Sequence, residues 1–145
     1  MARTIASPDL VDALFQLSFF LNGMLARIAA RHGLSVIQVR LLGILRDREP
    51  GMLELARHLE LEKSSLSGLV DRAETNRLVE RIPSRDDRRV ANVRVTEKGR
   101  KLSRIVEREV TAEVATLVAG LPVSERAHLA RLAGRVVTSA TSRAR

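Results

Sequence analysis

Apolar residues near the start of the chain recur every three or four positions, which is the period of an α-helix. The stripe is formed by Leu10, Leu14, Leu17, Leu21, Met24 and Ile28. Ser7-Pro8 is typical of a helix start, because serine caps the first turn and proline fits its first position. His32-Gly33 ends the pattern. Phe15, Phe19 and Phe20 widen the apolar surface beyond one face, so we expect this helix to be buried on two sides.

Three shorter helices are predicted in the middle of the chain. Ser35-Val36-Ile37-Gln38 is a capping box that opens the first of them, and this helix ends before Pro50-Gly51. The second carries apolar residues from Leu53 to Leu59, and the third runs from about Lys63 to Asn76. The apolar positions of all three follow the helical period.

After these helices the pattern changes to alternation. A short β-compatible run over 79–82 is followed by a polar, turn-like segment over 83–89 and by alternating apolar and polar residues over 91–95. This pattern predicts a β-hairpin. Thr96 is a candidate cap for a long fifth helix, which breaks at 120–122, and a last helix follows.

The fold class that follows is mainly α with a small β-hairpin. Aromatic residues make up only 2% of the 145-residue chain, so the core must be aliphatic, and the abundant Ala, Leu, Arg and Glu favour helix. The two terminal helices are too apolar to stay uncovered in so small a protein. The simplest cover is a second copy of the chain, so we expect a homodimer.

The stretch from Leu53 to Leu69 has the apolar spacing of a helix-turn-helix, whose second helix enters the major groove of duplex DNA. An ordinary helical hairpin is the alternative on these residues alone. The exposed start of the second helix has a cation and small residues that can approach base edges or phosphates. They are Lys63, Ser64, Ser65, Ser67 and Gly68. A simple N-capping role for Ser64 or Ser65 is the alternative for these hydroxyls.

The net charge of +8 and the isoelectric point near 11.4 indicate a polyanionic partner. Residues 72–108 hold twelve Lys or Arg and six Asp or Glu, a net +6 that accounts for most of the excess. Arg85, Arg88 and Arg89 gather at the tip of the predicted hairpin, which makes it a basic wing suited to the narrow minor groove. A solvated charged turn, neutralised by its own two aspartates, is the alternative.

The order of these elements and the segment 53–99 resemble the MarR family of bacterial regulators. The matching text is LELARHLELEKSSLSGLVDRAETNRLVERIPSRDDRRVANVRVTEKG. Its most specific part is Asp87-Arg88-Arg89, followed by alternating residues and then by Val95-Thr96-Glu97-Lys98-Gly99. The resemblance covers nearly the whole chain, although the terminal helices match only in pattern.

The resemblance implies a division of the chain. Residues 35–99 would form a winged helix-turn-helix DNA-binding lobe, and 1–34 with 100–145 would form a helical dimerisation region that intertwines with that of a second subunit. The two lobes would sit on successive major grooves of a pseudo-palindromic operator. Together with the residue pattern, it assigns DNA contacts to Lys63, Ser64, Ser65, Ser67, Gly68, Arg72, Arg85, Asp87, Arg88 and Arg89. Within that set, Asp87 would hold Arg89 by a charge-assisted hydrogen bond.

Three positions depart from the family's pattern. Gly68 stands where relatives often have a larger base-reading residue, which reduces direct readout and gives DNA shape a larger part. Glu60 and Arg77 stand where glycine is usual, in the turn and before the wing. Because the neighbouring Asn76 tolerates unusual backbone angles, we expect the helix before the wing to end one residue early.

The resemblance also implies transcriptional regulation, as a repressor that a small aromatic or phenolic acid releases from DNA. Such an effector would bind between the dimerisation and DNA-binding regions, where apolar walls and a few charges suit an aromatic acid. The candidate residues are Phe15, Phe19, Arg27, His32 and Arg40. Core packing is the alternative for the phenylalanines, and solvation or ion pairing is the alternative for the arginines.

No residue pattern indicates an enzyme or a cofactor. His32, His58 and His128 are far apart and lack metal-ligand spacing. The chain has no cysteine, which excludes disulfides, cysteine-ligated metals and thiol redox sensing. No apolar run approaches the roughly 20 residues of a membrane span, and Asp9 and Asp12 interrupt a signal-peptide core. We therefore expect a cytoplasmic protein with no membrane partner.

The alternative function is a basic winged helix that binds RNA or another protein and has no effector. RNA recognition usually exposes aromatic side chains for stacking on bases. All three aromatic residues lie in the first predicted helix, which favours duplex DNA as the partner.

Overall fold

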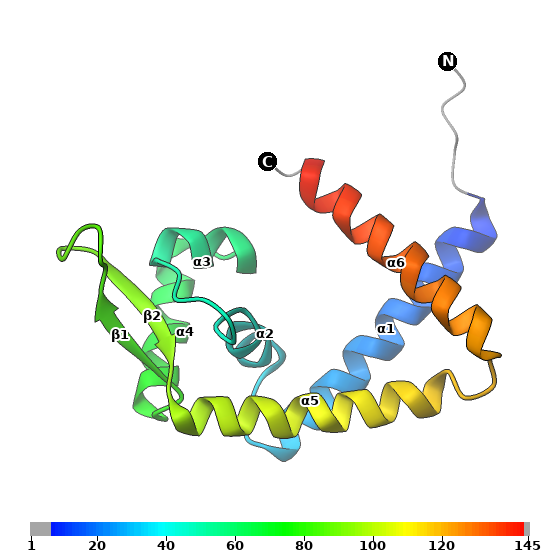
Figure 1. The fold of residues 1–145 in the computed structure, drawn as a ribbon, viewed down its shortest axis with the longest axis horizontal. Coiled ribbons are helices and arrows are strands. Elements are labelled where there is room, and N and C mark those ends of the chain that lie inside the picture. The colour runs from blue at the N-terminus through cyan, green and yellow to red at the C-terminus, as the bar shows by residue number, and fades with distance from the viewer. Residues whose placement is uncertain (1–6, 144–145) are drawn as a thin grey trace. The chain divides into compact units, whose positions relative to one another are not determined.

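The computed structural model describes residues 7–143, which form six helices and a two-stranded antiparallel sheet (Figure 1). In chain order the elements are α1 (Pro8–Arg31), α2 (Val36–Ile44), α3 (Met52–Leu59), α4 (Lys63–Thr75), β1 (Val79–Pro83), β2 (Ala91–Val95), α5 (Glu97–Leu117) and α6 (Val123–Arg143). The predicted class, mainly α with a small hairpin, is confirmed. The chain divides into two compact units between Val110 and Thr111, within α5.

The bounds of α1 agree with the pattern that predicted them. Ser7 is the N-cap, because its Oγ accepts a hydrogen bond from the backbone N–H of Leu10 at 3.2 Å. At the other end Gly33 adopts a φ of 68°, a left-handed conformation that glycine adopts without strain. The N–H of Leu34 can therefore bond the carbonyl of Ala29 at 2.9 Å, which closes the last turn.

The predicted capping box opens α2. Ser35 Oγ accepts a hydrogen bond from the N–H of Gln38 at 3.3 Å, and Gln38 Oε1 accepts one from the N–H of Ser35 at 2.9 Å. These bonds satisfy two N–H groups that a helix start otherwise leaves free. α1 packs against α2, with Ile28, Leu41 and Leu42 buried.

α3 and α4 pack against each other, as the apolar spacing predicts for a helix-turn-helix. Leu55 and Leu59 of α3 and Leu66 and Leu69 of α4 are each at most 2% exposed, and burial of such a side chain contributes roughly 1.5–3 kcal/mol. Glu60 closes α3 with a φ of 54°. A residue with a Cβ adopts this left-handed conformation at a cost of about 1–2 kcal/mol, which the packed leucines outweigh.

β1 and β2 form the predicted hairpin. Val79 pairs with Val95 and Arg81 pairs with Val93, so these four side chains share one face. The three valines are buried, and α4 packs against β1 while α3 packs against β2. The N–H of Val93 also donates to the carbonyl of Pro50 at 2.9 Å. The chain between α2 and α3 is thereby joined to the wing, which makes one packed lobe.

The backbone just before the wing differs from the expectation for Asn76. α4 ends at Thr75, and Asn76 has an ordinary φ of −80°. The left-handed residue is Arg77, with a φ of 58°. The N–H of Leu78 bonds the carbonyl of Ala73 at 2.9 Å, and this closing bond requires the residue directly before Leu78 to be left-handed. The prediction that Asn76 takes the unusual angles was therefore wrong.

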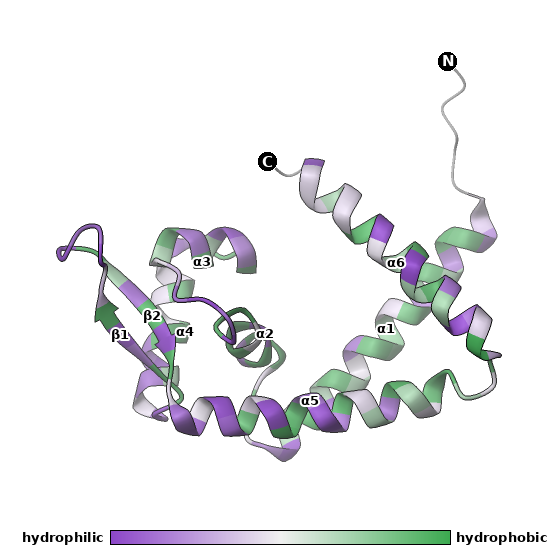
Figure 2. Ribbon diagram, viewed as in Figure 1, coloured by the Kyte–Doolittle hydropathy of each residue, from purple (hydrophilic) through white to green (hydrophobic). Residues whose placement is uncertain are grey.

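Hydrophobic residues recur along both terminal helices (Figure 2), and many of these side chains are exposed in the single chain. Phe15 and Phe19 on α1 are 58% and 70% exposed, and their ring centroids lie 6.1 Å apart. Within one chain, therefore, these phenylalanines do not pack in the core, and α1 is not buried on two sides. No residue of α6 is buried, and its exposed apolar residues are Val123, Leu129, Leu132, Val136 and Val137.

α1 also corrects the expectation that no apolar run approaches the length of a membrane span. Among the helices of residues 7–143, it is the one that is long and apolar enough to cross a membrane, with a mean hydropathy of 1.4. Gln16, Ser18 and Asn22 interrupt its centre, but they carry no charge. Length and composition alone are weak evidence for a span, because a helix that packs against other protein can have the same composition.

Candidate nucleic-acid interface

The start of α4 presents the predicted cation and hydroxyl groups. Three of these residues are exposed and two are half-buried, namely Lys63, Ser64 and Ser65, then Ser67 and Gly68. The N-cap is Glu62, whose side chain makes no capping hydrogen bond. Neither Ser64 nor Ser65 caps the helix, so the capping alternative is wrong. Both hydroxyls lie on the first turn, where unsatisfied N–H groups favour an anion.

Asp87 and Arg89 form the expected charge-assisted pair at the tip of the wing. Arg89 Nε donates to Asp87 Oδ1 at 3.1 Å, Nη2 donates to Oδ2 at 3.2 Å, and the backbone N–H of Arg89 donates to Oδ1 at 3.0 Å. These hydrogen bonds, those of the side chain first, hold the pKa of Asp87 below its ordinary value. The Arg89 side chain is nevertheless 90% exposed. It is therefore oriented by the protein and still open to a partner.

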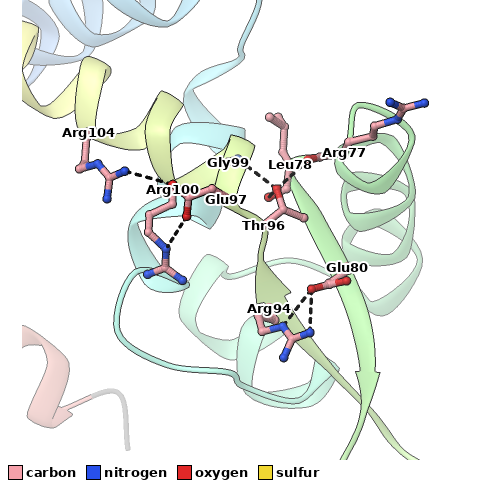
Figure 3. Close-up of polar contacts among 9 residues, drawn as sticks. All are labelled: Arg77, Leu78, Glu80, Arg94, Thr96, Glu97, Gly99, Arg100 and Arg104. Carbon is pink, nitrogen blue, oxygen red and sulfur yellow. Dashed lines mark hydrogen bonds and ion pairs between the residues drawn. The ribbon is translucent and has the colours of Figure 1, made fainter.

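The unpaired positive charge of the hairpin lies at its tip. Arg85 and Arg88 are exposed, and within the described part of the chain neither forms an ion pair. On the strands, by contrast, Arg94 Nη2 lies 2.8 Å from Glu80 Oε1 (Figure 3). The solvated-turn alternative assumed neutralisation by the two aspartates of the tip, but only Asp87 is bonded to an arginine there.

A clamp that the sequence analysis missed joins α4 to β1. Arg81 Nη2 lies 2.7 Å from Asp71 Oδ1, the backbone N–H of Arg81 donates to Glu74 Oε1 at 2.8 Å, and the Arg81 guanidinium also bonds Glu74. Partial burial would lower the pKa of Arg81, but the hydrogen bonds with both acids outweigh it and raise this pKa. The two acids lie three residues apart on α4, a spacing that places them side by side. That spacing is the feature of the sequence that could have indicated a binding site for an arginine.

A second connection holds the start of α5 against the turn between α4 and β1 (Figure 3). Thr96 Oγ1 donates toward the carbonyls of Arg77 at 2.7 Å and Leu78 at 3.1 Å, and it accepts from the N–H of Gly99 at 3.0 Å. A Cβ on Gly99 would lie 2.1 Å from the carbonyl oxygen of Leu78. The segment 95–99 therefore has a packing role, since it fixes the start of α5 to the base of the wing.

Of the candidate effector residues, Arg40 lines a cavity. This open cavity of about 400 Å³ is also lined by Arg46, Arg48 and His58, and Arg40 Nη2 donates to the carbonyl of His58 at 3.5 Å. Among residues 7–143 there is no group of three or more His, Asp or Glu side chains placed to hold a metal ion. Asp47 lines the cavity as well, and Arg46 Nε lies 3.0 Å from its Oδ2. Arg40 forms no ion pair within the described part of the chain, so its charge is the one that suits a carboxylate or another anion.

The other candidate effector residues lie elsewhere. Three are exposed on α1, namely Phe15, Phe19 and Arg27. His32 follows α1, and its Nε2 lies 2.7 Å from Oε1 of Glu109 on α5. Arg31 Nη2 donates to the other oxygen of the same carboxylate at 2.7 Å. The hydrogen bonds from Arg31 and then His32 hold the pKa of Glu109 below its ordinary value. A ligand role for these residues stays a prediction.

Comparison with known proteins relates this arrangement to characterised regulators. Residues 32–90 match a family model described as the MarR family. The chain is 28% identical over 131 residues to the HTH-type transcriptional regulator PecS of Dickeya dadantii (strain 3937), and this match covers 87% of the chain and 78% of PecS.

Solved structures share the fold over most of the chain. A mutant MarR from E. coli has a TM-score of 0.78 and 21% identity, with 92% of this chain and 99% of that chain covered. NadR, solved in complex with 4-hydroxyphenylacetate, has a TM-score of 0.73 and 22% identity, with 94% of this chain and 96% of that chain covered. At these identities the likeness establishes a common winged-helix fold.

Proposed function

We propose that this chain, which is similar to the MarR family of transcriptional regulators over residues 32–90 and to PecS over most of its length, is a member of that family and regulates by binding duplex DNA in a sequence-specific manner as a homodimer. α4 would enter the major groove and the wing would enter the neighbouring minor groove. The observation that carries this proposal is the wing tip, where Arg89 is oriented by Asp87 and is 90% exposed. An exposed cation, Lys63, at the start of α4 belongs to the same packed lobe.

The test of the wing is a titration of Arg89→Ala against duplex DNA at several salt concentrations. Loss of one phosphate contact should weaken binding to operator and random duplex alike and flatten the log–log salt dependence by about one unit. Arg108→Ala, which removes an equal charge from an exposed position on α5, is the matched control and should keep the wild-type slope. Wild-type binding by Arg89→Ala at every salt concentration would refute the role of the wing.

Substitution of Asp87 distinguishes an effect of net charge from orientation of Arg89, because the two predict opposite changes in DNA affinity. Removal of an acid beside DNA should strengthen binding if charge alone matters. If Asp87 orients Arg89, then Asp87→Ala should weaken binding despite the gain in net charge, because the freed side chain loses rotamer entropy when it binds. Asp86→Ala is the control, since Asp86 bonds Ser84 Oγ through its backbone N–H, which alanine keeps, and this variant should bind DNA more tightly than the wild type. Stronger binding by both variants contradicts the orienting role.

We assign dimerisation to 1–34 and 100–145 and DNA binding to 35–99. The exposed apolar residues of α1 and of α6 support this, because a second subunit would cover them and such interfaces often exceed ~2,000 Å². Two lobes related by symmetry would read a pseudo-palindromic operator. Sedimentation at micromolar concentration should give a dimer of the 16.1 kDa chain. Phe19→Glu should shift it toward monomer, and a folded wild-type monomer would contradict the assignment.

We further propose that the protein is a repressor released by an aromatic or phenolic acid. The ligand in the NadR structure supports this class of compound, and the cavity lined by Arg40, whose charge forms no ion pair among the described residues, supports an acid. A ligand that prefers a lobe spacing unsuited to DNA would shift the population away from the binding form. The candidate residues are Phe15, Phe19, Arg27, His32 and Arg40.

The effector experiment uses 4-hydroxyphenylacetate as the probe. The acid is titrated into a complex with DNA fragments from the protein's own locus, and a reporter gene gives the sign of regulation. We expect release from DNA, weaker release with Arg40→Ala, and no effect of mild peroxide, since the chain has no cysteine. Unchanged DNA binding at saturating acid would refute this class of effector.

The alternative function, an RNA-binding or protein-interaction module, is tested by comparing the binding of duplex DNA and of RNA to this protein. The three phenylalanines lie on α1 and none lies on the wing, which supports DNA as the ligand, since single-stranded RNA is usually held by stacking on aromatic side chains. Filter binding should favour duplex DNA over single-stranded RNA of equal length. We expect the protein in the cytoplasm, in contact with that DNA.

A further inference from the structure

We propose that Arg72 reads a guanine in the major groove, and that the absence of a side chain at Gly68 is what lets it reach the base. This inference deepens the proposed function and rests on it. It assigns the base specificity of α4 to Arg72. The Cα of this residue lies in the last turn of the helix, beyond the exposed first turns.

The first observation is the path of the Arg72 side chain. A Cβ on Gly68 would lie only 3.2 Å from Arg72 Nη1, so the guanidinium rests on the helix surface directly over Gly68. Side chains on a helix lean toward its N-terminus, and four residues span about 6 Å of rise. The charge of Arg72 is therefore carried one turn toward the start of α4, the part of a recognition helix that contacts base edges.

The second observation is that the charge of Arg72 is not used within the protein. The residue is exposed, and in the described part of the chain it forms no ion pair. The two acids beside it on α4, Asp71 and Glu74, both bond Arg81. An arginine that only stabilised the helix C-terminus would lie near the last carbonyl groups, but the guanidinium of Arg72 lies in the opposite direction, over Gly68.

The chemistry of the side chain indicates the base. A guanidinium is a planar donor group that can bond O6 and N7 of guanine together, and this bidentate pair discriminates against other bases by roughly 5- to 150-fold. Ser64 lies one further turn back on the same row of the helix. Its side chain is small, so the row leaves space for the helix to approach the base pair.

The experiment selects bound sequences from a pool of random duplexes with the wild type, Arg72→Ala, Arg72→Lys and Gly68→Leu. The wild type should enrich a symmetric motif that contains guanine at one position in each half. Arg72→Ala and Arg72→Lys should lose the preference at that position alone, because lysine keeps the charge but not the planar fork. Gly68→Leu should lose it too, since the new side chain occupies the path of the guanidinium. Circular dichroism confirms folding, and Gly43→Ala, at a helix glycine with open space around it, is the control.

A double-mutant cycle separates displacement of Arg72 from other effects of the leucine. If Gly68→Leu acts through Arg72, the double variant should discriminate guanine no worse than Arg72→Ala alone. An unchanged guanine preference in Arg72→Ala or in Arg72→Lys overturns the proposal, and so does an unchanged preference in Gly68→Leu. A wild type that enriches no motif refutes the sequence-specific binding of the proposed function itself, before any variant is compared.

Discussion

The sharpest prediction from this fold concerns Gly99→Ala. In most helices this change stabilises, by about 1 kcal/mol, because alanine has the higher helix propensity. Here the new Cβ would lie 2.1 Å from the carbonyl oxygen of Leu78 and 2.9 Å from Cγ2 of Val95. Ordinary carbon–oxygen contacts are about 3.3–3.6 Å, so the backbone at Leu78 has to move by roughly 1 Å.

That movement can be converted into an energy. The carbonyl of Leu78 accepts a hydrogen bond from the N–H of Thr96 at 3.0 Å and shares the Thr96 hydroxyl proton with the carbonyl of Arg77, so loss of these contacts costs about 1–2 kcal/mol. Overpacking against the buried Val95 adds about 1–3 kcal/mol. After the gain in propensity, Gly99→Ala should lower the free energy of unfolding by about 1–4 kcal/mol, a large part of the stability of an ordinary domain.

The assay is urea denaturation followed by circular dichroism, with Gly43→Ala as the matched control. Gly43 lies in α2, and a Cβ there would meet nothing within 4 Å, so this variant should unfold at the same or higher urea concentration than the wild type. Equal stability of Gly99→Ala and the wild type would refute the close approach of α5 to the base of the wing. It would also mean that packing does not require glycine at position 99.

Two further predictions concern pH and backbone strain. Arg31 and His32 hold the pKa of Glu109 below its ordinary value of 4.5, so the ionised carboxylate stabilises the fold above that pH, and this contribution is lost as the pH falls through the lower folded pKa. The stability difference between wild type and Glu109→Gln should therefore be present in urea titrations at pH 7 and shrink as the pH is lowered below 4.5. Arg77→Gly should raise the free energy of unfolding by about 0.5–1 kcal/mol, because Arg77 has a φ of 58°. Asn76→Gly should lower it, and the reverse order in thermal denaturation would place the left-handed residue at Asn76.

Features decided by residues close together in the chain could be predicted from the sequence. Ser7 bonds a group three residues away, and the capping box of Ser35 and Gln38 is reciprocal over the same distance. Such bonds form wherever the helix forms, so the residue types are sufficient to predict them. The pair of Asp87 and Arg89 is equally local, and the resemblance to the MarR family predicted it.

Other parts of the interface depend on residues brought together by folding. Arg81 could be identified as basic, but only packing of β1 on α4 places it between Asp71 and Glu74. The path of Arg72 over Gly68 involves two residues of one helix. Even so, an arginine has many rotamers, and engagement of the neighbouring acids by Arg81 is what leaves its charge unpaired.

The helices, the hairpin, the spacing of a helix-turn-helix and the concentration of positive charge at the wing could therefore be inferred from residue order alone, because hydrophobic period, capping and net charge are properties of neighbouring residues. The folded chain was needed to show that Arg77 rather than Asn76 is left-handed, since the hydrogen bond from the N–H of Leu78 to the carbonyl of Ala73 fixes that position. It also decided why Gly99 admits no side chain, because the carbonyl that would collide with a Cβ comes from the start of the hairpin, 21 residues earlier in the sequence. Contacts across such separations depend on how the elements pack, and no local pattern encodes that packing.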